Sequence, residues 1–408
     1  MTIQINDRDY AMPQKPAVVI CLDGCEPDYI DEAIDAGVMP ALAKVIAGGT
    51  RTLARSAMPS FTNPNNLSIA TGAPSSVHGI CGNFFLNPQT GEAVMMNSVE
   101  FLRAPTIFAG FQKAGAKVAV VTAKDKLREL LGAGLDCAAG AICFSAEKAD
   151  MAVGAINGLD DAANWLGLPV PAVYSGDLSI FVLKAGVKLM EESRPDILYL
   201  STSDYIQHKH APGTAEANAF MAEVDDAIAR LVAQNIRLVL TADHGMKAKH
   251  TPDGRPDVIY LNPLLEGLLG HGRARVILPI TDPYVAHHGA LGAFATIHVP
   301  SDVDPVVVAD ALARIEGMDQ VLTRREACAR FDLPADRIGD LVVTCVAGKA
   351  IGTAEEEHDL TGLDVPLRSH GGLDEQVVPF IVNGPMGSHQ NSTTLRNYDA
   401  WITAVGMV

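Results

Sequence analysis

Four apolar runs of similar length recur along this chain, and each ends in polar residues or a glycine. They are AVVICLDG (17–24), KVAVVTAK (117–124), ILYLSTSD (197–204) and RLVLTADHG (237–245). Runs of this kind are typical of strands buried on both faces of a parallel sheet. Helix-like stretches such as PALAKVIAGG and AEANAFMAEVDDAIARLVAQ lie between them. The alternation predicts a doubly wound α/β fold, to which a fifth run, VVPFIVNG (377–384), also contributes.

The segment from 247 to 366 departs from this pattern, with Pro-rich joints and one candidate strand, DLVVTCVAG. The chain has 408 residues, which is roughly two to three times the usual length of a domain. We therefore expect residues 1–246 and 367–408 to form an α/β core, and residues 247–366 to form an inserted α+β cap.

Charge and composition exclude several classes of protein. A net charge of −17 argues against a nucleic-acid surface, whereas a small anionic substrate is compatible with cations gathered in one cleft. The first sixteen residues contain no apolar signal-peptide core, and no stretch resembles a membrane span, so we expect a cytoplasmic protein without a membrane partner. Seven cysteines without a CxxC pair predict reduced thiols.

Three of the predicted strands are followed closely by an aspartate. These residues are Asp23, Asp204 and Asp243. Because ligands of open α/β sheets bind in the crevice beyond the carboxyl ends of the strands, a shared polar site is expected there.

Histidines near the same ends complete a set of metal-binding side chains. The full set is Asp23, Asp204, His208, Asp243, His244 and His370. Carboxylate oxygens and imidazole nitrogens are ligands of Zn²⁺, and a pair of such ions about 4 Å apart can clamp a displacement at phosphorus. The set therefore predicts a site for two Zn²⁺ ions, although Mn²⁺ or Fe²⁺ would accept the same ligands.

Spacing predicts how these side chains point. Asp204 and His208 lie four residues apart and share a face if a helical turn follows the strand. Adjacent residues in extended structure point to opposite sides, so Asp243 and His244 could each address a different ion. His210 is the main rival to His208 but lies off that helical face. Weaker candidates for a metal ligand are His250, His287 and His288.

A candidate nucleophile lies in SAMPSFTNPNNLSIATG (56–72). Pro64 and the polar residues before it predict a helix that starts just after Thr62, where free N–H groups favour a phosphoryl group. A metal-bound Thr62 hydroxyl would lose its proton readily and act as a nucleophile. The alternative is an ordinary helix-capping threonine.

The motifs LDG, PSFTNPNNLSIATG, DYIQHKHAPG, TADHGM and SHGG occur in the order seen in nucleotide pyrophosphatases and their relatives. Over residues 17–384 the chain thus resembles the alkaline phosphatase superfamily. The resemblance implies an α/β/α sandwich with a mostly parallel sheet and an inserted cap. It also implies one zinc ion bound by Asp204, His208 and His370, and a second bound by Asp23, Thr62, Asp243 and His244.

Within the superfamily, NPNN after Thr62, CGNFF (81–85) and TAKDKLR (122–128) resemble the phosphonoacetate hydrolases. This resemblance implies hydrolysis of the carbon–phosphorus bond of phosphonoacetate through a phosphothreonine intermediate, in a homodimer. Asn83 would then bind a phosphoryl oxygen, unless it is only a turn residue. Lys124 and Lys126, two residues apart beyond a strand, could stabilise the enolate-like leaving group, or could simply be solvated.

Three other functions fit the sequence less well than hydrolysis of phosphonoacetate. A nucleotide pyrophosphatase or phosphodiesterase would share the metal ligands but needs an aromatic platform, and aromatic residues make up only 5% of the chain. Relatives of phosphoglycerate mutase or phosphopentomutase generally use serine and often manganese. A metal-binding sensor without catalysis would not need the nucleophile.

Overall fold

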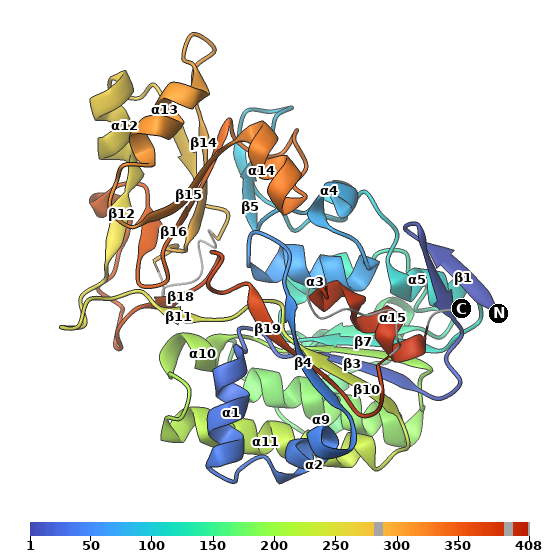
Figure 1. Ribbon diagram of the computed structural model, residues 1–408. Coiled ribbons are helices and arrows are strands. Elements are labelled where there is room, and N and C mark those ends of the chain that lie inside the picture. The colour runs from blue at the N-terminus through green and yellow to red at the C-terminus, as the bar shows by residue number, and fades with distance from the viewer. Residues whose placement is uncertain (281–288, 387–394, 407–408) are drawn as a thin grey trace.

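The computed structural model of the protein describes residues 1–280, 289–386 and 395–406. A seven-stranded sheet in the order β4-β19-β10-β3-β9-β7-β8 lies at its centre (Figure 1). Its strands are β3 (Ala17–Cys21), β4 (Thr50–Arg55), β7 (Val118–Thr122), β8 (Ile142–Ser145), β9 (Ile197–Ser201), β10 (Arg237–Thr241) and β19 (Val377–Val382). Strand β19 runs opposite to the other six strands, so the expected mostly parallel sheet is confirmed.

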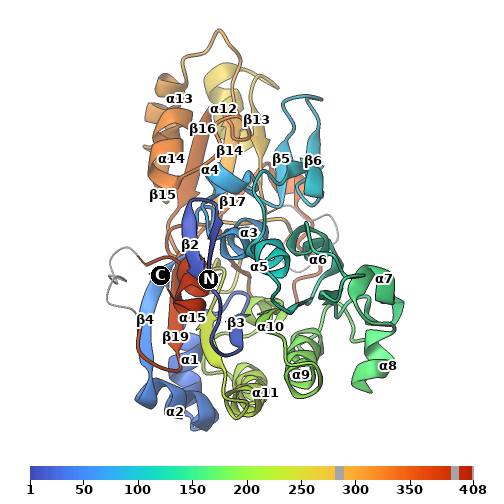
Figure 2. The same cartoon turned by 90° about the vertical axis from the view of Figure 1, so that its right-hand side faces the viewer.

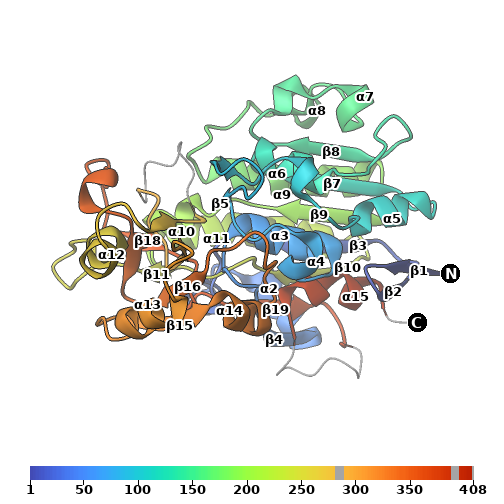
Figure 3. The same cartoon turned by 90° about the horizontal axis from the view of Figure 1, so that it is seen from above.

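Helices cover both faces of this sheet, which makes the α/β/α sandwich that the sequence predicts (Figures 1 and 3). One face carries α1 (Pro27–Asp35), α2 (Pro40–Gly48), α9 (Asp177–Glu192) and α11 (Ala215–Val232). The other carries α3 (Thr62–Thr71), α5 (Ile107–Lys113), α6 (Asp125–Leu131) and α15 (Ala400–Val405). The edge strands β4 and β8 were not anticipated, because their short sequences lack the long apolar run of the central strands.

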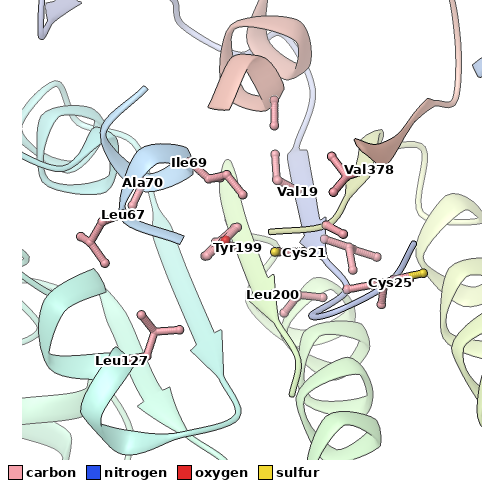
Figure 4. Close-up of a cluster of buried hydrophobic side chains, with 14 of the residues drawn as sticks. Val19, Cys21, Cys25, Leu67, Ile69, Ala70, Leu127, Tyr199, Leu200 and Val378 are labelled. Atoms are coloured by element: carbon pink, nitrogen blue, oxygen red, sulfur yellow. The ribbon is translucent and has the colours of Figure 1, made fainter. Parts of the chain in front are cut away.

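The core lies between the sheet and these helices. Figure 4 shows Ile69 of α3 beside the strand residues Val19 and Tyr199, and Leu67 of the same helix farther from them. All four side chains are fully buried. Burial of each such side chain stabilises the fold by about 1.5–3 kcal/mol, so the packing holds the start of α3 firmly over the carboxyl edge of the sheet.

A second lobe is built on a four-stranded antiparallel sheet, β13-β14-β16-β15 (Figure 1). The strands are β13 (Arg275–Ile277), β14 (Phe294–His298), β15 (Met318–Thr323) and β16 (Leu341–Cys345), accompanied by α12 (Leu261–Leu269), α13 (Pro305–Leu312) and α14 (Arg324–Phe331). Strand β16 confirms the strand predicted in DLVVTCVAG. The chain enters this lobe through β11 (Lys247–Ala248) and leaves it through β18 (Arg368–Ser369), and these two strands pair with each other.

Smaller elements complete the fold. A hairpin of β5 (Phe84–Leu86) and β6 (Ala93–Met95) lies against the second lobe beside β13 (Figure 2). The remaining elements are β1 (Thr2–Ile5), β2 (Arg8–Ala11), β12 (Val258–Tyr260), β17 (Ala350–Gly352), α4 (Ser75–His78), α7 (Gly154–Asn157), α8 (Ala162–Leu166) and α10 (Tyr205–Lys209). Within the described residues, no helix is both long and apolar enough to cross a membrane. All seven cysteines are unpaired, as predicted.

The strand register brings the polar ends together. Cys21 of β3 lies opposite Ser201 of β9 and Thr241 of β10, and Ser201 in turn lies opposite Thr122 of β7. The residues that follow these positions therefore emerge at one edge. Strand β19 runs the other way, so its beginning lies at this same edge, which explains why a site histidine can precede it.

Candidate active site

The six predicted ligand side chains converge at the carboxyl edge of the sheet, and all are buried. Asp204 Oδ2 lies 3.0 Å from His208 Nε2 and 3.6 Å from His370 Nε2. Two groups of side chains could each hold a metal ion, and Asp204 belongs to both. These groups are Asp204, His208 and His370, and Asp23, Asp204 and His244. Two ion positions would thus lie side by side.

The turn after β9 agrees with the predicted spacing. Asp204 precedes α10, and His208 lies one helical turn later on the same face. His210 ends this helix, and its ring points toward Glu216, whose Oε2 lies 3.8 Å from His210 Nδ1. His208, rather than its rival, therefore faces the other site residues.

The predicted divergence of Asp243 and His244 is wrong. Asp243 Oδ2 lies 3.8 Å from His244 Nε2, so both side chains face the same part of the site. Asp243 lies beyond the end of β10, where its Oδ1 accepts the backbone N–H groups of His244 (3.0 Å) and Gly24 (3.2 Å). The backbone is not extended in this loop, so the alternation that holds within a strand does not apply.

The three site histidines share one hydrogen-bond pattern. Nδ1 of His208, His244 and His370 lies 2.8, 2.9 and 2.8 Å from the backbone carbonyls of Arg368, Gly245 and Ser60. A carbonyl can only accept, so each Nδ1 carries a proton, and Nε2 is the nitrogen that a metal ion could bind once any second proton has left it. Hydrogen bonds of this kind orient metal-binding histidines, and here they direct every Nε2 into the site.

The charges of the site also fit a cation. Within the described part of the chain, Asp23 Oδ1 is buried without a hydrogen-bond partner, although His244 Nε2 lies 3.2 Å away. Burial raises the pKa of Asp23 well above its usual value, and the charges of Asp204 and Asp243 raise it further. Burial opposes protonation of His244, yet these three carboxylates raise the pKa of its imidazole to about 10. Carboxylates crowded against open imidazole nitrogens suit divalent metal ions.

Thr62 is the first residue of α3, so the helix begins slightly earlier than predicted. Phe61 occupies the capping position, and no side chain caps the helix. The alternative of an ordinary capping threonine is therefore wrong. Thr62 Oγ1 instead lies 3.3 Å from His244 Nε2, at the positive end of the α3 dipole. The free N–H groups expected at this helix start are mostly absent, because Asn63 N–H donates to Asn83 Oδ1 and Pro64 has no N–H.

Asn83, Lys124 and Lys126 line a single cavity of about 70 Å³ together with Thr62 and Asp23. Asn83 Oδ1 accepts the backbone N–H of Asn63 at 3.3 Å, which leaves the amide nitrogen of Asn83 available as a donor. The three predicted substrate-binding residues are thus brought to the predicted nucleophile.

Asn66 is a positioning residue that the sequence reasoning missed. Its Nδ2 donates to Asp243 Oδ2 (3.0 Å) and to the carbonyl of Thr62 (3.1 Å). Its Oδ1 accepts the hydroxyls of Tyr199 (2.7 Å) and Ser201 (2.8 Å). The signal was present in NPNN, because a buried amide inside a helix needs partners from elsewhere in the fold.

Contacts of Glu375 fix the loop that carries His370. Glu375 accepts the backbone N–H of Gly372 (2.8 Å) and pairs with Lys249, which is fully buried (2.8 Å). Gly371 has a φ of +119°, and a Cβ there would lie 2.4 Å from the ring of Phe61. This close approach brings the His370 loop next to the residue that precedes Thr62.

The weaker histidine candidates have different outcomes. His250 Nδ1 lies 2.9 Å from the carbonyl of Thr251, and within the described ranges His250 belongs to neither of the two metal-binding groups. His287 and His288 lie outside the described residues.

A buried cluster of carboxylates and imidazoles at the carboxyl edge of an α/β/α sandwich places the chain in the alkaline phosphatase superfamily. A sequence model of the type I phosphodiesterase / nucleotide pyrophosphatase family matches residues 17–373. The chain therefore belongs to this family.

Solved structures resemble the chain at two levels. Phosphonoacetate hydrolase from Sinorhizobium meliloti 1021, solved in complex with phosphonoacetate and with phosphonoformate, is 58% identical. The match has a TM-score of 0.97 and covers 99% of this chain and 98% of that one. Murine ectonucleotide pyrophosphatase / phosphodiesterase 5 is 18% identical, with a TM-score of 0.62 over 97% of both chains, and this likeness concerns the fold alone.

An uncharacterized pyrophosphatase/phosphodiesterase of Schizosaccharomyces pombe is 23% identical over 248 residues. The aligned stretch covers 57% of this chain and 45% of the yeast protein, so the chain spans less than half of that relative.

Proposed function

We propose that this chain hydrolyses phosphonoacetate to acetate and phosphate. The observation that carries the proposal is the 58% identity, over nearly the whole of both chains, with a phosphonoacetate hydrolase. The cavity beside Thr62 supports it, because two lysines and an asparagine face a hydroxyl and a cluster of metal-binding groups. Such a cavity suits a small substrate with two negatively charged ends.

We propose Zn²⁺ as the metal, with two ions per chain. One ion would be held by Asp204, His208 and His370, and the other by Asp23, Asp243 and His244 with the hydroxyl of Thr62. When bound, the ions would neutralise the crowded carboxylates, polarise phosphonyl oxygens and favour ionisation of the Thr62 hydroxyl.

Thr62 is the proposed nucleophile. Its Oγ forms a bond to phosphorus while the phosphorus–carbon bond breaks, and the electron pair of that bond delocalises into the substrate carboxylate. The carbon then takes a proton from solvent to give acetate. Water cleaves the phosphothreonine in a second step and releases phosphate. The positive end of the α3 dipole, where Thr62 lies, favours the negative phosphoryl oxygens during both steps.

Asn83, Lys124 and Lys126 are the proposed substrate-binding residues. The amide nitrogen of Asn83 donates to a phosphonyl oxygen, and the two ammonium groups stabilise the growing enolate-like charge. Lys124 already influences the site electrostatically. Burial opposes a low pKa at Asp204, but His208 and, next, Lys124 bring this pKa well below its usual value.

Neutralising either lysine should slow the reaction. We expect Lys124→Met and Lys126→Met each to lower kcat for phosphonoacetate by about 10²–10³-fold, since each removes a charge that stabilises the transition state. Lys113→Met, which changes an exposed lysine at the end of α5, is the matched control and should retain full activity. Steady-state kinetics on zinc-loaded protein would measure kcat for each of these variants. Unchanged kcat in both site variants would show that the lysines are merely solvated.

The competing function is hydrolysis of nucleotide esters, which the name of the matched family favours. No aromatic side chain in the described residues lines the cavity, so a nucleobase would lack a stacking platform there. We expect kcat/KM for phosphonoacetate to exceed that for a nitrophenyl ester of thymidine monophosphate by at least about 100-fold, the scale set by lost polar contacts. Faster cleavage of the nucleotide ester would reverse the assignment.

We also propose that residues 247–366 form the inserted cap, since the chain enters and leaves that lobe through the paired strands β11 and β18. The homodimer and the cytoplasmic location stay predictions from the sequence.

A further inference from the structure

Thr122, at the end of β7, has a side chain that the fold leaves without a partner. The residue is fully buried. Its Oγ1 has no hydrogen-bond partner among residues 1–280, 289–386 and 395–406. A buried hydroxyl without a partner is costly, so its place in the fold calls for an explanation.

The hydroxyl lies at the proposed substrate site. Thr122 lines the same cavity as Thr62, Lys124 and Lys126. The chain bends after β7, at Ala123 and Lys124, and Lys124 lines the same cavity as Thr122.

Two neighbouring side-chain oxygens of this cavity are engaged by the protein. Thr202 Oγ1 accepts the backbone N–H of Asp23 at 2.9 Å, and Asn83 Oδ1 accepts that of Asn63. The Thr122 hydroxyl has no such role. It therefore remains a donor that a ligand can satisfy.

We propose that Thr122 is a substrate-binding residue whose hydroxyl donates a hydrogen bond to the carboxylate of phosphonoacetate. This inference rests on the function proposed above. The phosphonyl end of the substrate must lie at Thr62 and the metal-binding groups, so the carboxylate end lies toward the lysines that follow β7. Thr122 would thereby help to select substrates that carry a carboxylate next to the scissile bond.

Thr122→Val removes the hydroxyl but keeps the shape of the side chain. We expect kcat/KM for phosphonoacetate to fall roughly 10- to 100-fold, as for a lost hydrogen bond to a charged group. Thr122→Ser should recover most of this loss. The melting temperature of Thr122→Val should not fall, because the substitution removes an unpartnered buried hydroxyl. Thr90→Val, the same change at an exposed threonine, is the control.

Binding measurements locate the contact. Calorimetric titrations of zinc-loaded Thr62→Ala protein, with and without the Thr122→Val substitution, would compare two ligands, phosphonoacetate and inorganic phosphate. Loss of the contact should weaken binding of phosphonoacetate roughly 10-fold or more, as for a hydrogen bond to a charged group, and binding of phosphate less than about twofold. Equal weakening of both ligands would overturn the assignment to the carboxylate.

Two outcomes separate this inference from the proposed function. If the wild-type protein releases no phosphate from phosphonoacetate, the proposed function fails. If it does, and Thr122→Val matches it in kinetics and binding, only the role of Thr122 fails. Loss in Thr122→Val that Thr122→Ser does not recover would also overturn the inference, because the hydroxyl would then be irrelevant.

Discussion

Replacement of Thr62 with alanine should lower kcat for phosphonoacetate by about 10⁴-fold or more, the scale seen when a nucleophile is removed. The reason is geometric. Thr62 Oγ1 lies 3.3 Å from His244 Nε2 at the first turn of α3, and the variant leaves no other hydroxyl at that atom position. Phosphate release by zinc-loaded protein measures the effect, and metal content should stay close to that of the wild type.

Thr71→Ala is a matched control for this variant. Thr71 is the last residue of the same helix, and its hydroxyl donates only to the carbonyl of Leu67. We expect a stability loss of about 1 kcal/mol and kcat within about twofold. Rapid quenching of the wild type should yield a phosphorylated peptide that contains Thr62. Full activity in Thr62→Ala would refute covalent catalysis by this residue.

Removal of metal should abolish activity almost completely. Burial and then the charges of Asp204 and Asp243 raise the pKa of Asp23 well above its usual value, and a bound cation would stabilise all three carboxylates in their charged form. We expect protein dialysed against a chelator to lose at least about 10³-fold in kcat, on the scale of losing several kcal/mol of charge stabilisation. Its melting temperature should also fall, because metal ions bind the folded state. Metal analysis before and after dialysis would verify the removal.

Reconstitution would then identify the metal. Zn²⁺, Mn²⁺ and Fe²⁺ are each accepted by carboxylate and imidazole ligands, so the three ions should be added separately to the metal-free protein. We expect Zn²⁺ to restore activity with two ions per chain. Binding should weaken as the pH falls, because protons compete with the metal for His244, whose pKa the neighbouring carboxylates raise to about 10 against the effect of burial. Activity that survives verified removal of all metal would contradict the proposed site.

Local reasoning failed where loops depart from regular structure. It predicted that Asp243 and His244 would diverge, because adjacent side chains do so in a strand. Both residues lie beyond β10, where Asp243 Oδ1 accepts the N–H of His244 and turns the backbone. Asn66 was missed for a related reason. Its partners Asp243, Tyr199 and Ser201 lie far away in the sequence.

The sequence by itself determined the class of fold, and it predicted most of the side chains that the structure brings together at the candidate site. Buried parallel strands have long apolar runs, and polar residues at their ends must face the edge where ligands bind. A local stretch of sequence therefore indicates both the strand and the polar residues that follow it. The spacing of Asp204 and His208 was equally local. The tertiary structure alone decided that β19 runs antiparallel, which brings His370 to the edge where the parallel strands end. It also decided which nitrogen of each site histidine faces inward, and that the Thr122 hydroxyl has no hydrogen-bond partner within the described part of the chain. These features depend on register and on contacts between distant segments, which no local pattern contains.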